Sequence, residues 1–218
     1  MDSNPYFISR SDVGKKFADE LLNLRYENTA VLALSPGGVV IGIEIAKRLH
    51  SIAGLLLTKH IHVPGNTPYG MISEHGEFVY DKSVSIAQAE EFKSEYRNAI
   101  EQEKLEVMHK LHIVGHEGSL EPKFFTGKNV IIVNDISLTG TSYQAAVDFL
   151  KPVPFDSLIL VAAVAKNNSA DIMHHLGDKV LIAHKTDKDF PSSHYFVNDE
   201  IPQSKALLRM MEQVILQW

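Results

Sequence analysis

A polar run follows an apolar stretch in the second half of the sequence, and its residue types suit the binding of a phosphate and a sugar. Residues 130–133 are Val-Ile-Ile-Val, Asn134 and Asp135 come next, and residues 137–142 read Ser-Leu-Thr-Gly-Thr-Ser. The hydroxyl groups of the second run are hydrogen-bond donors, and Gly140 permits the close backbone approach that a phosphate needs. Asn134 and Asp135 supply oxygen acceptors for a sugar diol. An ordinary turn in which Ser or Thr caps a helix is the alternative interpretation.

A second loop of similar character lies earlier in the chain. Ser35-Pro36-Gly37-Gly38 follows an apolar stretch at residues 29–34. The two glycines are free to adopt positive φ and to present N–H groups to an anion, so we expect this loop and the 137–142 loop to face one another. Lys59, at the end of a third apolar stretch, is a candidate for reaching the same crevice. A plain turn and a surface lysine are the simpler alternatives.

The elements that position these residues alternate between strand and helix. Apolar runs at residues 29–34, 54–59, 130–133, 157–165 and 179–183 predict strands buried on both faces. Helical spacing of apolar residues predicts helices at 39–49, 143–150 and 171–176, with further helices at 11–22 and 202–218. This order predicts an α/β fold, a doubly wound and mainly parallel sheet flanked by helices. Such sheets bind ligands at the carboxyl ends of their strands, where a helix N-terminus favours an anion.

Residues 60–127 interrupt this alternation. We predict one domain over residues 1–218, with 60–127 as an insertion or subdomain. Breakers between residues 60 and 70 predict a mobile segment or a hairpin, and short strands are expected at 71–74 and 77–80. A long charged helix is expected from Ser83 to about Val114.

The composition argues against several classes of protein. The net charge is −6, and no basic run suggests a nucleic-acid or anionic-membrane partner. The absence of cysteine rules out disulfides and thiol chemistry, which fits the cytoplasm. No apolar run approaches the ~20 residues of a membrane-spanning helix. Walker, Gly-x-Gly-x-x-Gly and Gly-x-Ser-x-Gly motifs are missing, and the eleven histidines do not have zinc-site spacing. We expect a soluble cytoplasmic protein whose loops hold a small anionic ligand.

Residues 130–142 resemble the ribose-phosphate binding motif of the type I phosphoribosyltransferases, in which an apolar strand, two acidic residues and a Thr-Gly loop precede a helix. Residues 33–39, with Glu44-Ile45-Ala46, look like the pyrophosphate loop and following helix of that family. The long charged helix and the aromatic-acidic segment 195–199 are similar to a branch of uncharacterised bacterial phosphoribosyltransferase-like proteins. The resemblance covers nearly the whole chain.

The resemblance implies a glycosyltransferase that binds phosphoribosyl pyrophosphate, or a nucleotide, by its 5′-phosphate. It would transfer phosphoribose to a nucleobase-like acceptor and release pyrophosphate. The implied 5′-phosphate residues are Ser137, Leu138, Thr139, Gly140, Thr141 and Ser142; the ribose residues are Asn134 and Asp135; the pyrophosphate residues are Ser35, Pro36, Gly37 and Gly38. Asp135 and Lys59 are the candidate catalytic residues.

The resemblance also implies Mg²⁺, bound through the oxygens of the ligand and, on the protein, at most by Asp135. A homodimer is the expected assembly. A hood over the acceptor is expected from residues 1–10, 60–80 or 186–200.

Three positions depart from the family pattern. Asn134 replaces the first acid of the pair, so one charge and one oxygen acceptor are lost. Pro36 stands where this branch usually has Arg, and Leu138 stands where some purine-using relatives have an acid that acts as a base. These departures support an alternative function, a catalytically impaired protein of this fold that regulates by binding a nucleotide or sugar phosphate.

Overall fold

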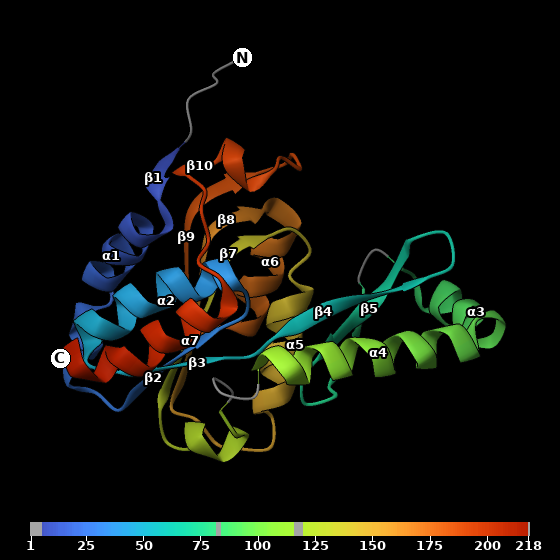
Figure 1. Cartoon of the computed structure of the whole chain (residues 1–218), viewed down its shortest axis with the longest axis horizontal. Coiled ribbons are helices and arrows are strands. Elements are labelled where there is room, and N and C mark those ends of the chain that lie inside the picture. Colours follow the sequence, from blue (N-terminus) through green and yellow to red (C-terminus); the bar gives the residue numbers. More distant parts are fainter. Residues whose placement is uncertain (1–5, 82–83, 116–119, 218) are drawn as a thin grey trace.

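The central sheet has five parallel strands in the order β3-β2-β7-β8-β9 (Figure 1). The computed structural model describes residues 6–81, 84–115 and 120–217. The strands are β2 (Thr29–Ala33), β3 (Ile52–Leu55), β7 (Asn129–Ser137), β8 (Ser157–Lys166) and β9 (Lys179–Thr186). All four neighbouring pairs are parallel, which confirms the predicted sheet.

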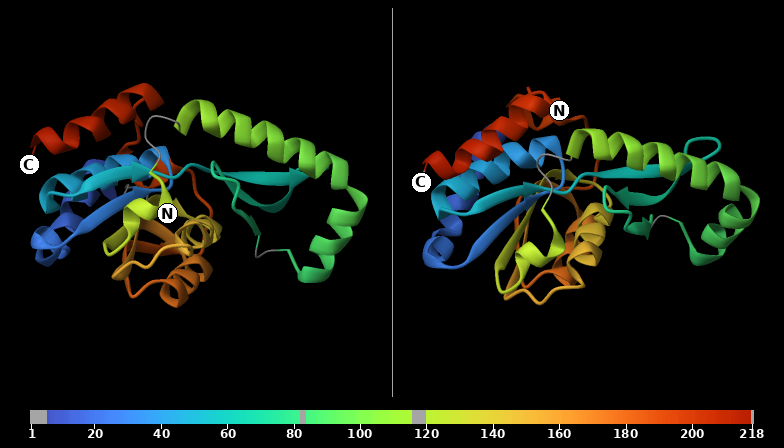
Figure 2. Two further views of the ribbon diagram at one scale, coloured as in Figure 1. Left: turned by 90° about the horizontal axis from the view of Figure 1, so that it is seen from below. Right: turned by 60° about the horizontal axis from the view of Figure 1, so that its bottom comes forward.

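Helices cover both faces of this sheet (Figure 2). One face carries α1 (Arg10–Glu20), α2 (Pro36–Leu49) and α7 (Ser204–Glu212), and the other carries α5 (Thr141–Leu150) and α6 (Asn167–Leu176). Along β7, Ile131 and Val133 belong to the first core, whereas Val130 and Ile132 belong to the second. Because successive strand residues point to opposite faces, a strand covered on both sides needs an uninterrupted apolar run.

Several boundaries differ from the sequence-based expectation. Strand β7 does not end at Val133, because its ladder to β8 continues through the pairs Asn134↔Ala162, Ile136↔Val164 and Ser137↔Ala165. The predicted strand 54–59 is divided, since β3 ends at Leu55 and the next strand starts in another sheet. Helix α6 starts at Asn167, four residues earlier than expected.

An arm projects from the central sheet (Figures 1 and 2). It contains an antiparallel sheet of β4 (Thr58–Val63), β5 (Thr67–Ser73) and β6 (Phe78–Tyr80), packed against α3 (Ile86–Glu95) and α4 (Arg97–Gly115). The predicted hairpin is confirmed by the β4–β5 pairing. The prediction of a single long helix is wrong, because the chain leaves the helical conformation at Tyr96, between α3 and α4. Ala89 of α3 and Ile100 of α4 belong to the same hydrophobic core. The expected start at Ser83 lies outside the described residues.

A third, two-stranded sheet joins distant parts of the chain. Strand β1 (Phe7–Ser9) pairs in parallel with β10 (Phe196–Asn198), and both lie beyond the carboxyl end of β9 (Figure 1). Short 3₁₀ helices complete the fold: η1 (Leu22–Tyr26), η2 (Pro122–Phe125), η3 (Ser192–His194) and η4 (Gln213–Gln217). Within the described part of the chain, no helix combines the length and hydrophobicity needed to cross a bilayer.

Candidate functional site

The carboxyl ends of β2 and β7 meet at a buried polar cluster. The Ser35 hydroxyl, just after β2, lies 2.7 Å from Asn134 Oδ1 and 2.8 Å from Asp135 Oδ1. It has one proton, so it donates to one of the two acceptors at a time. Asn134 is 5% exposed and Asp135 is 8% exposed. The 35–38 loop therefore meets the polar pair of β7 through Ser35, while its expected facing of the 137–142 loop stays a prediction.

Arg10, the first residue of α1, occupies the other oxygen of Asp135. Its Nε donates to Asp135 Oδ2 at 2.8 Å, and its Nη1 lies 3.0 Å from Asp199 Oδ1. The guanidinium also stacks over the Phe196 ring, 4.3 Å from its centroid. Only 2% of the Arg10 side chain is exposed. A buried charge requires such pairing because its removal from water is otherwise very unfavourable.

The two glycines after Pro36 form the first turn of a helix, and the expectation that they adopt positive φ is wrong. Ser35 is the N-cap of α2 and its Oγ accepts the Gly38 N–H at 2.9 Å, while Pro36 takes the first helical position that suits proline. A Cβ on Gly37 would lie 1.9 Å from Asp135 Oδ2, and one on Gly38 would lie 2.7 Å from the Val133 carbonyl oxygen. Close packing of α2 on β7 therefore requires both glycines.

The segment after β7 has the geometry of an anion-binding turn. Gly140 is the N-cap of α5 with φ +74°, a left-handed conformation that favours glycine, and it has no side chain to cap the helix. The first N–H of α5, that of Thr141, donates to Thr139 Oγ1 at 3.4 Å. Thr139 Oγ1 lies 2.9 Å from Thr141 Oγ1, which orders two hydroxyls at the turn. Leu138 is exposed, and Ser142 is partly exposed in the first turn of α5. The positive end of α5 thus opens onto a hydroxyl-rich turn.

Ser137 differs from its neighbours in this loop. It is the last residue of β7, and its Oγ lies 2.7 Å from the Oγ of fully buried Ser169 on α6. The side chain is therefore bonded inside the protein. Tyr143, one turn into α5, donates its hydroxyl to the Val161 carbonyl oxygen at 2.6 Å and fixes the helix against β8. Burial raises the pKa of the Tyr143 hydroxyl well above its usual value, so it stays protonated as a donor.

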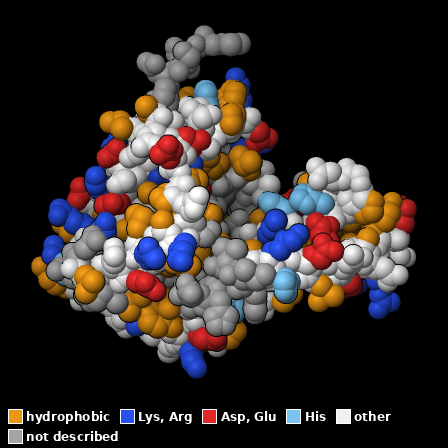
Figure 3. Space-filling model, in the orientation of Figure 1, with side chains coloured by type: hydrophobic (Ala, Val, Ile, Leu, Met, Phe, Trp, Pro, Cys, Tyr) orange, Lys and Arg blue, Asp and Glu red, His pale blue; other side chains and the backbone are white. Residues whose placement is uncertain are grey.

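Lys59 lies on the arm, and the residues around it belong to the arm and not to this polar cluster. It is exposed on β4 and lines a cavity of about 470 Å³ against α4, together with His60, His62, Glu103, Glu106, Val107 and Lys110. Figure 3 shows Lys, Glu and His side chains gathered on the arm beside a hollow that separates it from the body of the protein. Burial lowers the pKa of His60, which favours its neutral form. The catalytic role of Lys59 stays a prediction.

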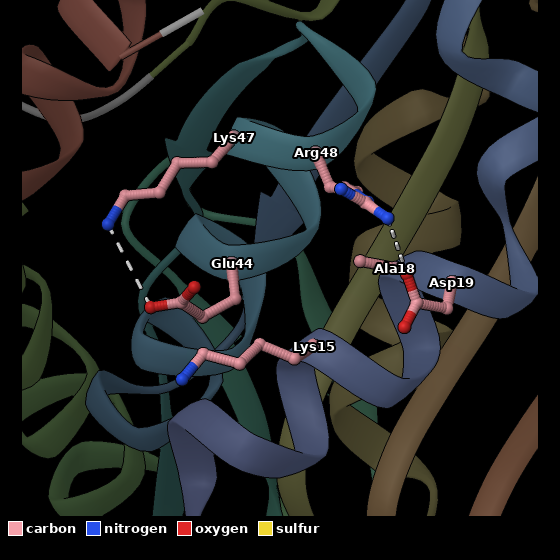
Figure 4. Close-up of a pocket in the computed structure, with 6 residues that line it drawn as sticks. All are labelled: Lys15, Ala18, Asp19, Glu44, Lys47 and Arg48. Atoms are coloured by element: carbon pink, nitrogen blue, oxygen red, sulfur yellow. Dashed lines mark ion pairs between the residues drawn. The ribbon is translucent and has the colours of Figure 1, made fainter.

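A further cavity of about 380 Å³ lies between α1 and α2 (Figure 4). Its charged side chains pair with one another: Lys47 Nζ lies 3.8 Å from Glu44 Oε1, and Arg48 Nη2 lies 3.2 Å from Asp19 Oδ1. None of the predicted site residues lines it.

The donor set does not suit a directly bound magnesium ion. Among the residues that the structure describes, no three His, Asp or Glu side chains are placed to share a metal ion. Asp135, the one predicted protein ligand, has one oxygen on Ser35 and the other on Arg10. A metal ion at this site would have to be carried by oxygens of the ligand.

Aromatic side chains gather where Tyr6, strand β9 and the segment around η3 meet. Tyr6 stacks on His184 of β9 with ring centroids 4.0 Å apart, and Phe190 lies 4.1 Å from His194. Tyr195 contacts both His184 and His194. Burial, and secondarily His194, lower the pKa of His184. Of the segments predicted for a hood, residues 6–10 and 186–200 thus lie together, residues 1–5 are outside the described part of the chain, and 60–80 belongs to the arm.

Arg10 and Asp199 were not among the predicted site residues. Arg10 precedes a predicted amphipathic helix and carries no motif, and it is 125 residues from Asp135. Asp199 did fall in the aromatic-acidic segment that drew attention in the sequence. Its Oδ2 accepts from the Ser192 hydroxyl at 2.7 Å, which ties that segment together.

Comparisons with known proteins agree with this geometry. Residues 8–191 match the phosphoribosyl transferase domain family. A Mycobacterium tuberculosis protein (strain CDC 1551), provisionally named a phosphoribosyl transferase, is 26% identical over 165 residues, covering 74% of this chain and 36% of that protein. The chain thus spans about a third of the length of this relative. TT1426 from Thermus thermophilus superposes with a TM-score of 0.70 at 21% identity, covering 98% and 99% of the two chains. A hypothetical protein from Neisseria gonorrhoeae with bound ppGpp has a TM-score of 0.51 at 12% identity, covering 97% and 98%.

The fold and the loop between β7 and α5 define a class of protein, an open parallel α/β sheet with a hydroxyl-rich turn at its carboxyl edge. Within that class, the match over residues 8–191 shows that the chain belongs to the phosphoribosyl transferase domain family. The resemblance seen in the sequence is confirmed.

Proposed function

We propose that this protein binds the 5′-phosphate of phosphoribosyl pyrophosphate or of a nucleotide at residues 137–142. The observation that carries the proposal is Gly140, which holds the left-handed turn at φ +74° and gives α5 an N-cap residue that has no side chain. The helix end favours an anion, and the partly exposed Thr139 and Ser142 provide hydroxyl donors, whereas Thr141 is buried and bonded to Thr139.

Binding without transfer is the function that the geometry supports best. In phosphoribosyl transfer the ribose hydroxyls need free acceptors, but Asn134 and Asp135 are buried and bonded to Ser35 and Arg10. The protein would then regulate by sensing a nucleotide or a sugar phosphate. The Neisseria gonorrhoeae structure with bound ppGpp supports the inclusion of that compound among the ligands to be tested.

Transfer of phosphoribose to a nucleobase-like acceptor is the second candidate, and membership of the family favours it. Asp135 would have to exchange Arg10 for the ribose hydroxyls. The loop at residues 137–142 would hold the 5′-phosphate while C1′ of the ribose loses pyrophosphate and gains the acceptor nitrogen. Mg²⁺ would enter with the ligand, bound by the oxygens of its pyrophosphate and ribose. In this scheme Ser35 to Gly38 would face the pyrophosphate. The homodimer and the cytoplasmic location also stay predictions.

Calorimetry with a glycine variant tests the phosphate site. In Gly140→Ala the added Cβ would meet Ile172 at 3.1 Å in a strained backbone, so the turn must change and affinity for ribose 5-phosphate should fall by about tenfold or more. Gly127→Ala is the matched control, because Gly127 also has positive φ (+61°) but its Cβ would meet open space. Equal affinity of both variants and wild type would overturn the assignment. Release of pyrophosphate from phosphoribosyl pyrophosphate with any nucleobase would favour transfer over binding alone.

A further inference from the structure

We infer that Arg10 determines ligand specificity: by occupying Asp135 it makes binding at this site independent of magnesium and selects metal-free sugar phosphates and nucleotides. The inference rests on the proposed function, since it concerns the ribose end of the same site. In this inference the Arg10 guanidinium lies beside Asp135, where a divalent cation would otherwise bind.

Both oxygens of the Asp135 carboxylate already accept a hydrogen bond from the protein. Oδ1 is 2.8 Å from the Ser35 hydroxyl and Oδ2 is 2.8 Å from Arg10 Nε. Gly37 closes the flank of Oδ2, because even a methyl group there would lie 1.9 Å from this oxygen. The side chain is only 11% exposed. A magnesium ion demands near-octahedral oxygen ligands, so it would have to displace the guanidinium.

The guanidinium is held from several directions and is not easily displaced. Besides Asp135, it contacts the Asp199 carboxylate at 3.0 Å, the Asp199 carbonyl oxygen at 3.3 Å and the Phe196 ring. Its backbone is also fixed, since Ser9 before it is both the end of β1 and the N-cap of α1. Removal of one partner from a buried, hydrogen-bonded ion pair is strongly unfavourable.

The charges at this end of the site are less negative than a pair of acidic residues at positions 134 and 135 would make them. Arg10 pairs with both Asp135 and Asp199, and Asn134 adds a neutral amide where a second carboxylate would add another negative charge. A phosphorylated ligand therefore meets less electrostatic repulsion and does not need a metal ion to bridge it to carboxylates. Ribose phosphates and nucleoside monophosphates fit this chemistry better than a magnesium complex of phosphoribosyl pyrophosphate.

Calorimetry in EDTA and in excess Mg²⁺ tests the inference, with ribose 5-phosphate as the probe. The wild-type affinity should agree within about twofold in the two conditions. In Arg10→Gln the carboxylate is released, so Mg²⁺ should raise the affinity by about tenfold, the effect of one gained charge-assisted contact. Electron paramagnetic resonance of Mn²⁺ in the presence of ribose 5-phosphate should detect a bound ion in Arg10→Gln and none in wild type.

Two further variants keep the outcome decisive. Arg10→Lys keeps a positive charge and should stay independent of magnesium, and Arg48→Gln, which changes an exposed ion pair on α2, should behave as wild type. If Arg10→Gln does not fold, the affinities of the wild type and Arg10→Lys in EDTA and in Mg²⁺ still test the inference, because a magnesium requirement in either protein contradicts it. A magnesium requirement in the wild type, or magnesium independence of a folded Arg10→Gln, would overturn the inference and leave the phosphate site standing. If the wild type binds ribose 5-phosphate in neither condition, the proposed function itself fails.

Discussion

Asp135 has a different environment from the one its sequence position suggests. In the sequence it is the acidic half of a diol-binding pair, whereas in the structure it anchors α1 through Arg10 and the start of α2 through Ser35. A buried carboxylate needs a positive partner, and the partner here is far away in the chain. One residue therefore links the proposed ribose end of the site to the stability of the fold.

Gly37→Ala tests this packing at the scale of a residue. The new methyl group would lie 1.9 Å from Asp135 Oδ2 and 2.7 Å from Arg10 Nε, so the ion pair or the helix must move. We expect the free energy of unfolding to fall by about 2–3 kcal/mol, although alanine suits a helix better than glycine by about 1 kcal/mol. Urea unfolding measures the change. A variant as stable as wild type would show that Asp135 does not pack against Gly37.

The polar residues of the site could be predicted from the sequence, but their partners could not. Asn134, Asp135 and Gly140 stand out because polar residues and a glycine follow a buried apolar run. Gly37 and Gly38 also stand out, yet composition cannot distinguish a glycine needed for positive φ from one needed for close packing. Arg10 gives no local signal because its partners, Asp135 and Asp199, are distant in sequence.

At the scale of elements, the long strands of the central sheet can be predicted from the sequence, whereas the short strands β1 and β10 cannot. The central strands are covered on both faces, and this environment imposes the uninterrupted apolar runs seen at residues 130–133 and 157–165. Strands β1 and β10 have three residues each and leave no periodicity to detect. The break between α3 and α4 gives no signal in the sequence, because it falls at Tyr96, which is neither glycine nor proline.

The aromatic cluster of Tyr6, His184, Phe190, His194 and Tyr195 should make the stability of the protein depend on pH. Burial lowers the pKa of His184 below its usual value of 6.5, so the unfolded chain binds a proton more readily than the folded protein does. The resulting stabilisation is present above pH 6.5 and is lost as the pH falls through 6.5 towards the folded-state pKa. His184→Phe keeps a ring against Tyr6 but cannot titrate. Its melting temperature should therefore fall less than that of wild type between about pH 7.5 and 5.5.

A surface histidine provides the control for this prediction. His174 is exposed on α6, so His174→Phe should show the same pH dependence as wild type. Calorimetric melting curves at both pH values compare the three proteins. An equal loss of stability in His184→Phe and wild type would show that His184 does not contribute.

At the scale of the whole molecule, the site is assembled from parts that are far apart in the chain. The five-stranded sheet supplies Asn134 and Asp135, α1 supplies Arg10, and the segment after β9 supplies Asp199. Lys59, the remaining predicted site residue, lies on the small sheet of the arm, outside this cluster. The order of strands and helices in the sequence predicts the sheet and marks the arm as an insertion, but it does not predict that β1 pairs with β10.

An engineered disulfide tests that closure. Ile8 and Val197 are the central residues of β1 and β10, between the paired positions Phe7↔Phe196 and Ser9↔Asn198, and they are 70% and 66% exposed. The chain has no cysteine, so Ile8→Cys/Val197→Cys can form only one intramolecular bridge. Because the bridge closes nearly the whole chain into a loop, it should raise the free energy of unfolding by up to about 5 kcal/mol. Urea unfolding measures this difference when the oxidised double variant is compared with the same variant after reduction. Ile8→Ser/Val197→Ser is the control that cannot form a bridge. Failure of the bridge to form in the folded protein would contradict the β1–β10 pairing, and with it the position of Arg10 between Asp135 and Asp199.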